Sequence, residues 1–224
     1  MYFGDKKLSE IAVSVPGSTS LLREYDLDFC CGGSDTLANA AAEKGLNLAE
    51  IETRLTELQN SKAENPEEYW VNATYPEIID HILVRYHQRH REQLQELIVL
   101  ADRVESVHGD REDCPIGVAA ELRNVYEDLS NHMMKEEHVL FPMIKAGNYM
   151  MAQMPIRMME MEHAEHGEHL DVLKSLTNNM TPPADACNTW RALYSGIQEF
   201  ADDLMMHIHR ENNILFPRVI AENH

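Results

Sequence analysis

Two stretches of the sequence place a histidine and a glutamate four residues apart, shortly before an aliphatic-Leu-Phe-Pro run. They are HMMKEEHVLFPMIKA, from His132 to Ala146, and HIHRENNILFPRVIA, from His207 to Ala221. Residues four apart on a helix lie one above the other on the same face. Because imidazole and carboxylate groups are common ligands of first-row metal ions, this spacing predicts metal chemistry.

Two further segments match each other in the same way. HQRHREQL begins at His87, and HAEHGEHL begins at His163. His163 follows His87 by 76 residues, and His207 follows His132 by 75. The chain therefore contains two helix pairs related by internal duplication, each with a histidine on its first helix and His-x3-Glu on its second.

Apolar residues at helical spacing put these motifs on the core-facing side of their helices. A carboxylate buried without a partner costs several kcal/mol, and Glu136 and Glu211 would also repel each other. Two metal ions between them remove both problems. The predicted ligands are four imidazoles and two bridging carboxylates: His87, His132, Glu136, His163, His207 and Glu211. This mixed set favours iron and leaves manganese or zinc open.

The remaining histidines have weaker claims to the site. His90 and His166 lie three residues after His87 and His163, and we expect them to be hydrogen-bonding neighbours of the ligands. They could instead be additional ligands or line a channel. The histidines that fall off the apolar stripes are expected to face solvent: His81, His138, His169 and His209.

The elements that must position these ligands are four long helices, predicted at 77–107, 116–147, 154–177 and 185–220. Short polar breaks between them favour an all-α, up-down-up-down four-helix bundle over 77–224. Pro142 and Pro217 should bend their helices beyond the ligands. A small helical domain with a Cys-Cys motif is predicted over 1–60, and the polar segment 61–76 is predicted to be a linker.

Composition excludes several classes of protein. The 224 residues carry 38 acidic and 19 basic side chains, a formal charge of −19, which argues against a nucleic-acid surface. There is no run of 18 apolar residues, so we expect a soluble, cytoplasmic protein that does not enter a membrane. The thirteen methionines, including Met133, Met134, Met158 and Met159, are expected to fill gaps in the core.

Adjacent cysteines form a second candidate site. Cys30 and Cys31 precede two glycines in DFCCGG, which suggests exposed thiols on a turn. Such thiols could handle iron, exchange disulfides or react with nitric oxide. The alternative is that one of them is simply buried, since free cysteine is among the most buried residues.

These motifs resemble those of the hemerythrin-like family of di-iron helical bundles. Within that family, the chain is similar to the bacterial iron–sulfur cluster repair ("repair of iron centres") proteins. The segments that carry this similarity are DLDFCCGGSDTLANAAA, YHQRHREQL and HMMKEEHVLFPMIKAG. The resemblance implies two non-haem iron ions on the six ligands, with or without an oxo or hydroxo bridge. It also implies repair of iron–sulfur proteins whose clusters are damaged by nitric oxide or oxidative stress, in the cytoplasm, by a homodimer.

Equal ligands in the two halves suggest that each iron keeps an exchangeable position and that the iron is labile enough to donate. Two other functions remain open at this point. The centre could be a nitric oxide or dioxygen sensor, or a di-iron reductase of nitric oxide or nitrite, so the sequence does not decide whether the protein is an enzyme. A metal-free bundle with packed histidines is disfavoured, because it leaves both glutamates without neutralising partners.

Overall fold

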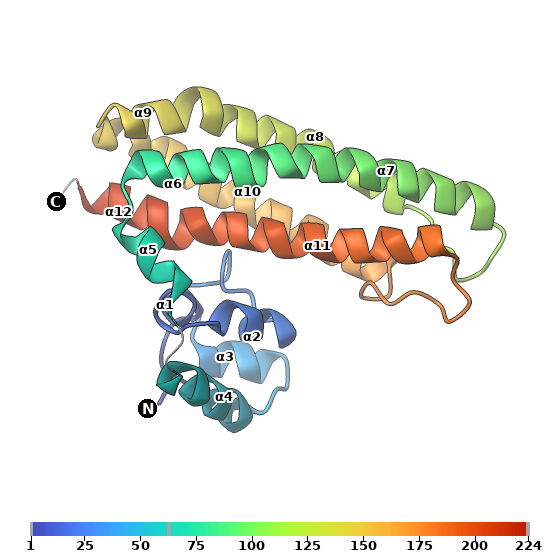
Figure 1. Ribbon diagram of the computed structural model, residues 1–224, viewed down its shortest axis with the longest axis horizontal. Helices are drawn as coiled ribbons and strands as arrows, with labels where there is room; N and C mark the ends of the chain where they lie inside the picture. Colours follow the sequence, from blue (N-terminus) through green and yellow to red (C-terminus); the bar gives the residue numbers. More distant parts are fainter. Residues whose placement is uncertain (1, 62–63, 223–224) are drawn as a thin grey trace. The chain divides into compact units, whose positions relative to one another are not determined.

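The computed structural model describes residues 2–61 and 64–222 and divides the chain into two compact units. One comprises Met1–Ile78 with Met206–His224, and the other comprises Ile79–Met205. Both are built from helices (Figure 1). Among the described residues, the β-pairing is limited to an isolated bridge between Lys7 and Thr36. The prediction of an all-α protein is confirmed.

The unit Ile79–Met205 contains the four long helices of a bundle (Figure 1). They are α7 (Gln88–His108), α8 (Val118–Lys135), α10 (Tyr149–Leu176) and α11 (Asn188–Arg210), of which α11 continues past Met205 into the other unit. Their inward faces bury an apolar core that includes Leu94, Leu97, Leu122, Leu129, Ile156, Leu173, Trp190, Ile197 and Phe200. This burial, at about 25 cal/mol per Å² of apolar surface, is the main favourable term that holds the helices together.

Three of the four long helices, α7, α8 and α11, adjoin a π-helical turn at one end. A π-helical turn, η1 (Ile82–His87), precedes α7 and follows α6 (Tyr75–His81). A second, η2 (Glu136–Leu140), joins α8 to α9 (Phe141–Lys145), and a third, η3 (Glu211–Leu215), joins α11 to α12 (Phe216–Ala221). Such turns often occur at functional sites.

The third rod begins earlier than its sequence predicts. The sequence predicts a start at residue 154, but α10 begins at Tyr149 and contains Pro155. Ala152 and Ile156 are fully buried on its inner face. Continued burial of that face outweighs the single backbone hydrogen bond that the proline removes.

The other unit has a core of its own. Its short helices are α1 (Leu8–Ser14), α2 (Ser18–Glu24), α3 (Leu37–Glu43), α4 (Leu48–Asn60) and α5 (Pro66–Asn72). They enclose Phe3, Ile11, Leu22, Phe29, Leu37, Ile51 and Leu55. Helix α5 lies inside the segment 61–76, where the Asn65 side chain accepts the Glu67 amide and Pro66 occupies the first turn.

The methionines are only partly in the core. Met133 and Met159 are buried, as predicted, but Met134 and Met158 are 49% and 50% exposed. The prediction is wrong for these two because they lie on the outer faces of α8 and α10. None of the helices in the described part of the chain is both long and apolar enough to cross a membrane.

Candidate metal centre

Four of the predicted ligands lie in the unit Ile79–Met205, and all four are buried. His87 ends η1, His132 lies near the end of α8, Glu136 begins η2, and His163 lies midway along α10. The Nε2 atoms of His132 and His163 are 3.1 Å apart. These ring nitrogens therefore converge on one small volume.

The other two ligands repeat the α8–η2 arrangement. His207 lies in the last turn of α11, and Glu211 begins η3. Both are fully buried, and His207 Nε2 lies 3.4 Å from Glu211 Oε1. The corresponding distance from His132 Nε2 to Glu136 Oε1 is also 3.4 Å.

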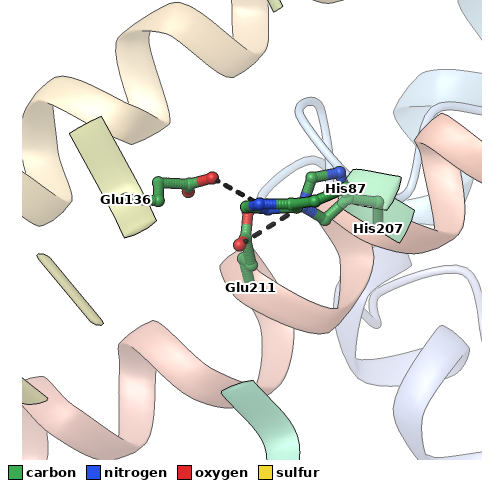
Figure 2. A group of neighbouring side chains, drawn as sticks. All are labelled: His87, Glu136, His207 and Glu211. Carbon is green, nitrogen blue, oxygen red and sulfur yellow. Dashed lines mark ion pairs between the residues drawn. The ribbon is translucent and has the colours of Figure 1, made fainter. Parts of the chain in front are cut away.

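The six residues form two groups of potential metal donors. One group consists of His87, Glu136, His207 and Glu211, whose side chains point toward one another in Figure 2. The other consists of His132, Glu136, His163 and Glu211. Within each group the donor atoms lie within 4.8 Å of one another. Both glutamates belong to both groups, while each histidine belongs to one.

Glu136 divides its two oxygens between these groups. Its Oε2 faces His87 Nε2 at 3.3 Å, and its Oε1 faces His132 Nε2 at 3.4 Å. A carboxylate in this position can bind one ion with each oxygen. The geometry thus fits a carboxylate that bridges two cations.

Two outer glutamates fix the imidazole rings. Glu137 Oε1 lies 2.8 Å from Nδ1 of His87, and Glu162 Oε2 lies 2.9 Å from Nδ1 of His132. With Nδ1–H donating outward, the lone pair of Nε2 faces the centre, as in many histidine–metal sites. No pattern in the sequence singles out either glutamate, although each directly adjoins a predicted ligand.

The same contacts perturb the outer carboxyl groups. The hydrogen bond from His87, reinforced by Arg91 at 2.7 Å, lowers the pKa of Glu137 to about 2. The hydrogen bond from His132, reinforced by Lys135 at 2.5 Å, lowers the pKa of Glu162 to about 2. Both glutamates are therefore ionised at neutral pH.

The π-helical turns coincide with the ligands. Each of η2 and η3 begins at a glutamate ligand and is followed by Phe-Pro, at Pro142 and Pro217. Because proline has no amide hydrogen, the regular hydrogen-bond ladder is already interrupted there. The wider turn adjusts the direction of the ligand-bearing face within an otherwise continuous rod.

His90 and His166 belong to neither group of donors. His166 is buried, and its ring packs edge-on against that of His132, with centroids 4.9 Å apart. His90 is also buried, but it packs against Tyr86 and Phe200. His166 therefore contacts a predicted ligand through its ring, and the hydrogen-bonding role expected of both histidines stays a prediction.

Not all the histidines off the stripes face solvent. His138 is exposed, but His81 and His169 are half-buried, and His169 pairs with Glu121 at 2.6 Å. His209 is fully buried, so the prediction is wrong for it. It lies on the opposite side of its helix from the ligands, and the sequence alone did not show that other residues cover that side.

The cysteine pair occupies a tight loop. Cys30 is buried and Cys31 is half-buried, so the expectation of two exposed thiols is wrong for Cys30. Their sulfur atoms are 3.8 Å apart, and Asp28 completes a third group of potential donors with them. Contact with Cys31, together with burial, raises the pKa of the Cys30 thiol well above its usual range.

The donor set fits iron. Metal bonds to imidazole nitrogen and carboxylate oxygen are about 2.0–2.2 Å long, so donors on one ion lie no more than about 4.4 Å apart. The observed clusters need little adjustment to reach such distances. Glu136 and Glu211 are both 0% exposed, and cations between them would offset the cost of burying two like charges.

The outer glutamates lead to a prediction about pH. Their carboxyl pKa is lower in the folded protein than its ordinary value of 4.5. They therefore stabilise the fold above about pH 4.5, and this contribution is lost as the pH falls toward about 2. In metal-free protein, E137Q/E162Q should lose less unfolding free energy than wild type between about pH 5 and about pH 3. The difference should be on the order of 1 kcal/mol per carboxylate.

Urea unfolding at the two pH values measures this difference. E168Q, a substitution at an exposed glutamate on α10, is the control and should behave as wild type. Equal pH dependence in E137Q/E162Q and wild type would contradict the assignment of the low pKa values.

Comparison with known proteins identifies relatives along the whole chain. Residues 78–219 match the Hemerythrin HHE cation binding domain, and residues 4–59 match a domain of unknown function, DUF542. A "Probable iron-sulfur cluster repair protein" of Haemophilus influenzae is 68% identical over 99% of this chain and 100% of the relative. An "Iron-sulfur cluster repair protein YtfE" of Musicola paradisiaca is 54% identical over 98% of each chain, and one of Escherichia coli is 54% identical over 99% of each.

Proposed function

This chain belongs to the hemerythrin HHE cation-binding family and, within it, to the iron–sulfur cluster repair proteins, and from that premise we propose that it repairs clusters by donating iron. Two iron ions would be held between Glu136 and Glu211, one with His87 and His207 and the other with His132 and His163. The observation that carries the proposal is the division of the Glu136 oxygens between two imidazoles at 3.3 and 3.4 Å.

The residues of the site divide the work between holding and orienting. The four imidazoles and two carboxylates bind the iron. Glu137 orients the His87 ring, and Glu162 orients the His132 ring, each through a contact with Nδ1. When bound, the ions supply ligand-exchange chemistry at positions that the protein does not fill. Each ion would have only two imidazole ligands. Fewer protein–metal bonds must therefore break before the iron leaves than in a centre with more imidazoles for each ion.

The finer parts of the proposal rest on the family resemblance. Damage by nitric oxide or oxidative stress would create the demand for iron, and nitric oxide or dioxygen could occupy the exchangeable positions. We place the protein in the cytoplasm as a homodimer, whose formation must overcome the repulsion between two chains of charge −19. Sedimentation at low and high salt tests the dimer, because screening should strengthen it.

Iron transfer tests the proposed function. Protein purified without oxygen should contain about two iron ions per chain and should restore activity to an apo iron–sulfur enzyme. The transferred metal is followed by isotopic labelling of the protein's iron. Labelled iron that stays with this protein while the target remains inactive would overturn donation. Catalytic formation of nitrous oxide from nitric oxide would favour the reductase alternative.

A further inference from the structure

The two halves of the duplicated sequence differ on the side of the helix that faces away from the ligands. With the offset of 75 residues, Met134 corresponds to His209, and His138 corresponds to Asn213. Met134 is 49% exposed and His138 is exposed, whereas His209 is 0% exposed. The turn around Glu211 is therefore covered at positions where the turn around Glu136 is open.

The residue before Glu211 is held by helix α5 and its neighbourhood. Arg210 is 3% exposed and pairs with Glu67, which is 5% exposed. The Arg210 guanidinium also lies over the ring of Trp70, 4.8 Å from its centroid. A buried, doubly bonded arginine fixes its own backbone more firmly than the half-exposed Lys135 at the equivalent position can.

His209 adds a second contact on the same side. Its ring packs edge-on against Phe29, with centroids 5.3 Å apart, and its Nε2 lies 3.5 Å from Glu67 Oε2. The Asn213 amide donates to its Nδ1 at 2.8 Å. His209 thereby links the residues before Glu211 to those after it.

The residues after Glu211 are bonded to the cysteine loop. The side-chain amide of Asn212 donates to the carbonyl of Cys30 at 3.0 Å, and that of Asn213 donates to the carbonyl of Phe29 at 2.8 Å. The loop itself is well defined, because the Asp28 carboxylate accepts the amides of Cys30, Cys31 and Gly32 at 2.8–2.9 Å. All of these residues belong to one compact unit.

We infer that Asn212, Asn213, His209 and Arg210 form a clamp through which the N-terminal segment positions Glu211. Two residues on each side of Glu211 are tied to residues 29, 30, 67 and 70, so the direction of the η3 turn depends on them. The inference rests on the proposed function, in which Glu211 binds both ions. Because binding and positioning are linked, iron should in turn order the cysteine loop.

Removing the asparagine half of the clamp tests the inference. In N212A/N213A, loss of iron to a chelator should be about tenfold faster than in wild type, as expected when two hydrogen bonds that hold a ligand are removed. The control is M134A/H138A, which changes two exposed residues in the other half of the duplicated sequence. Their positions correspond to those of His209 and Asn213. Its iron should leave at the wild-type rate.

Hydrogen exchange provides a readout that does not depend on transfer activity. Iron should slow exchange of the amides of residues 28–32 in wild type and should slow it much less in N212A/N213A. The variant E67M/R210M removes the Glu67–Arg210 ion pair of the clamp. Because both charges are replaced, neither is left buried without its partner. This variant should also lose iron faster than wild type. Circular dichroism establishes that each variant is folded before it is compared.

The outcomes distinguish the clamp from the proposed function. Wild-type protein that binds iron but does not donate it would overturn the proposed function and leave the exchange measurement decisive for the clamp. Iron loss and loop exchange that are unchanged in both clamp variants would overturn the clamp while donation stands. A more mobile loop with unchanged iron loss would also overturn it, because the contacts would then be structural only.

Discussion

Replacing Glu136 and Glu211 together by glutamine is expected to abolish iron binding and, at the same time, to stabilise the iron-free protein. The two carboxylates are fully buried and belong to both donor groups, so their loss would remove the ligands that we propose to bridge the two ions. Without metal, the burial and mutual repulsion of the two carboxylates oppose folding, a cost that we expect to exceed the attraction of the adjacent imidazoles. Glutamine keeps the shape of the side chain and removes the charge.

We expect iron to fall from about two per chain to below about 0.2, while the unfolding free energy of the iron-free protein rises by about 1–4 kcal/mol. Metal analysis and urea unfolding of chelator-treated protein measure the two effects. E168Q, at an exposed position of α10, should change neither. A metal-free E136Q/E211Q protein less stable than metal-free wild type would show that the carboxylates stabilise the fold without cations.

Pairs of histidine substitutions should reveal which imidazoles share an ion. His87 and His207 belong to one donor group, and His132 and His163 belong to the other. H87A/H207A strips both imidazoles from one ion and should leave about one iron per chain. H87A/H163A weakens both ions and should leave less iron than H87A/H207A, although each variant lacks two histidines.

Iron content and the absorption or Mössbauer spectrum of the remaining iron test this assignment. H138A, at an exposed histidine outside both groups, controls for loss of an imidazole in general. Equal iron content in the two double variants would contradict the grouping. A reversed order, with more iron in H87A/H163A, would indicate that His87 shares an ion with His163 and that His132 shares the other with His207.

The set of candidate ligands was predictable from sequence because it depends on local spacing. His132 and Glu136 are four residues apart, and so are His207 and Glu211, which places each pair on one helical face. The assignment of histidines to groups was not predictable. It depends on the direction of each side chain after the π-helical turns, and no pattern in the sequence announced those turns.

The predictions that were wrong concern the burial of side chains, which depends on tertiary packing. His209 and Met134 occupy equivalent positions in a repeated motif, yet one is buried and the other is half exposed. The difference arises from Phe29 and Glu67, which are distant in sequence and contact His209. The burial of Cys30 likewise depends on the folded loop rather than on its Gly-Gly neighbour.

The repeated irregular turns also bear on ancestry. The η2 and η3 turns begin 75 residues apart, at Glu136 and Glu211, so the copied segment already contained this irregularity when it doubled. Each donor group contains one histidine and one glutamate from the first copy and one histidine and one glutamate from the second. A forebear of half the length would thus have lacked a complete set for even one ion, and only a pair of such chains could have enclosed metal. In the present chain the two halves are covalently joined, so bringing the donor groups together does not depend on protein concentration.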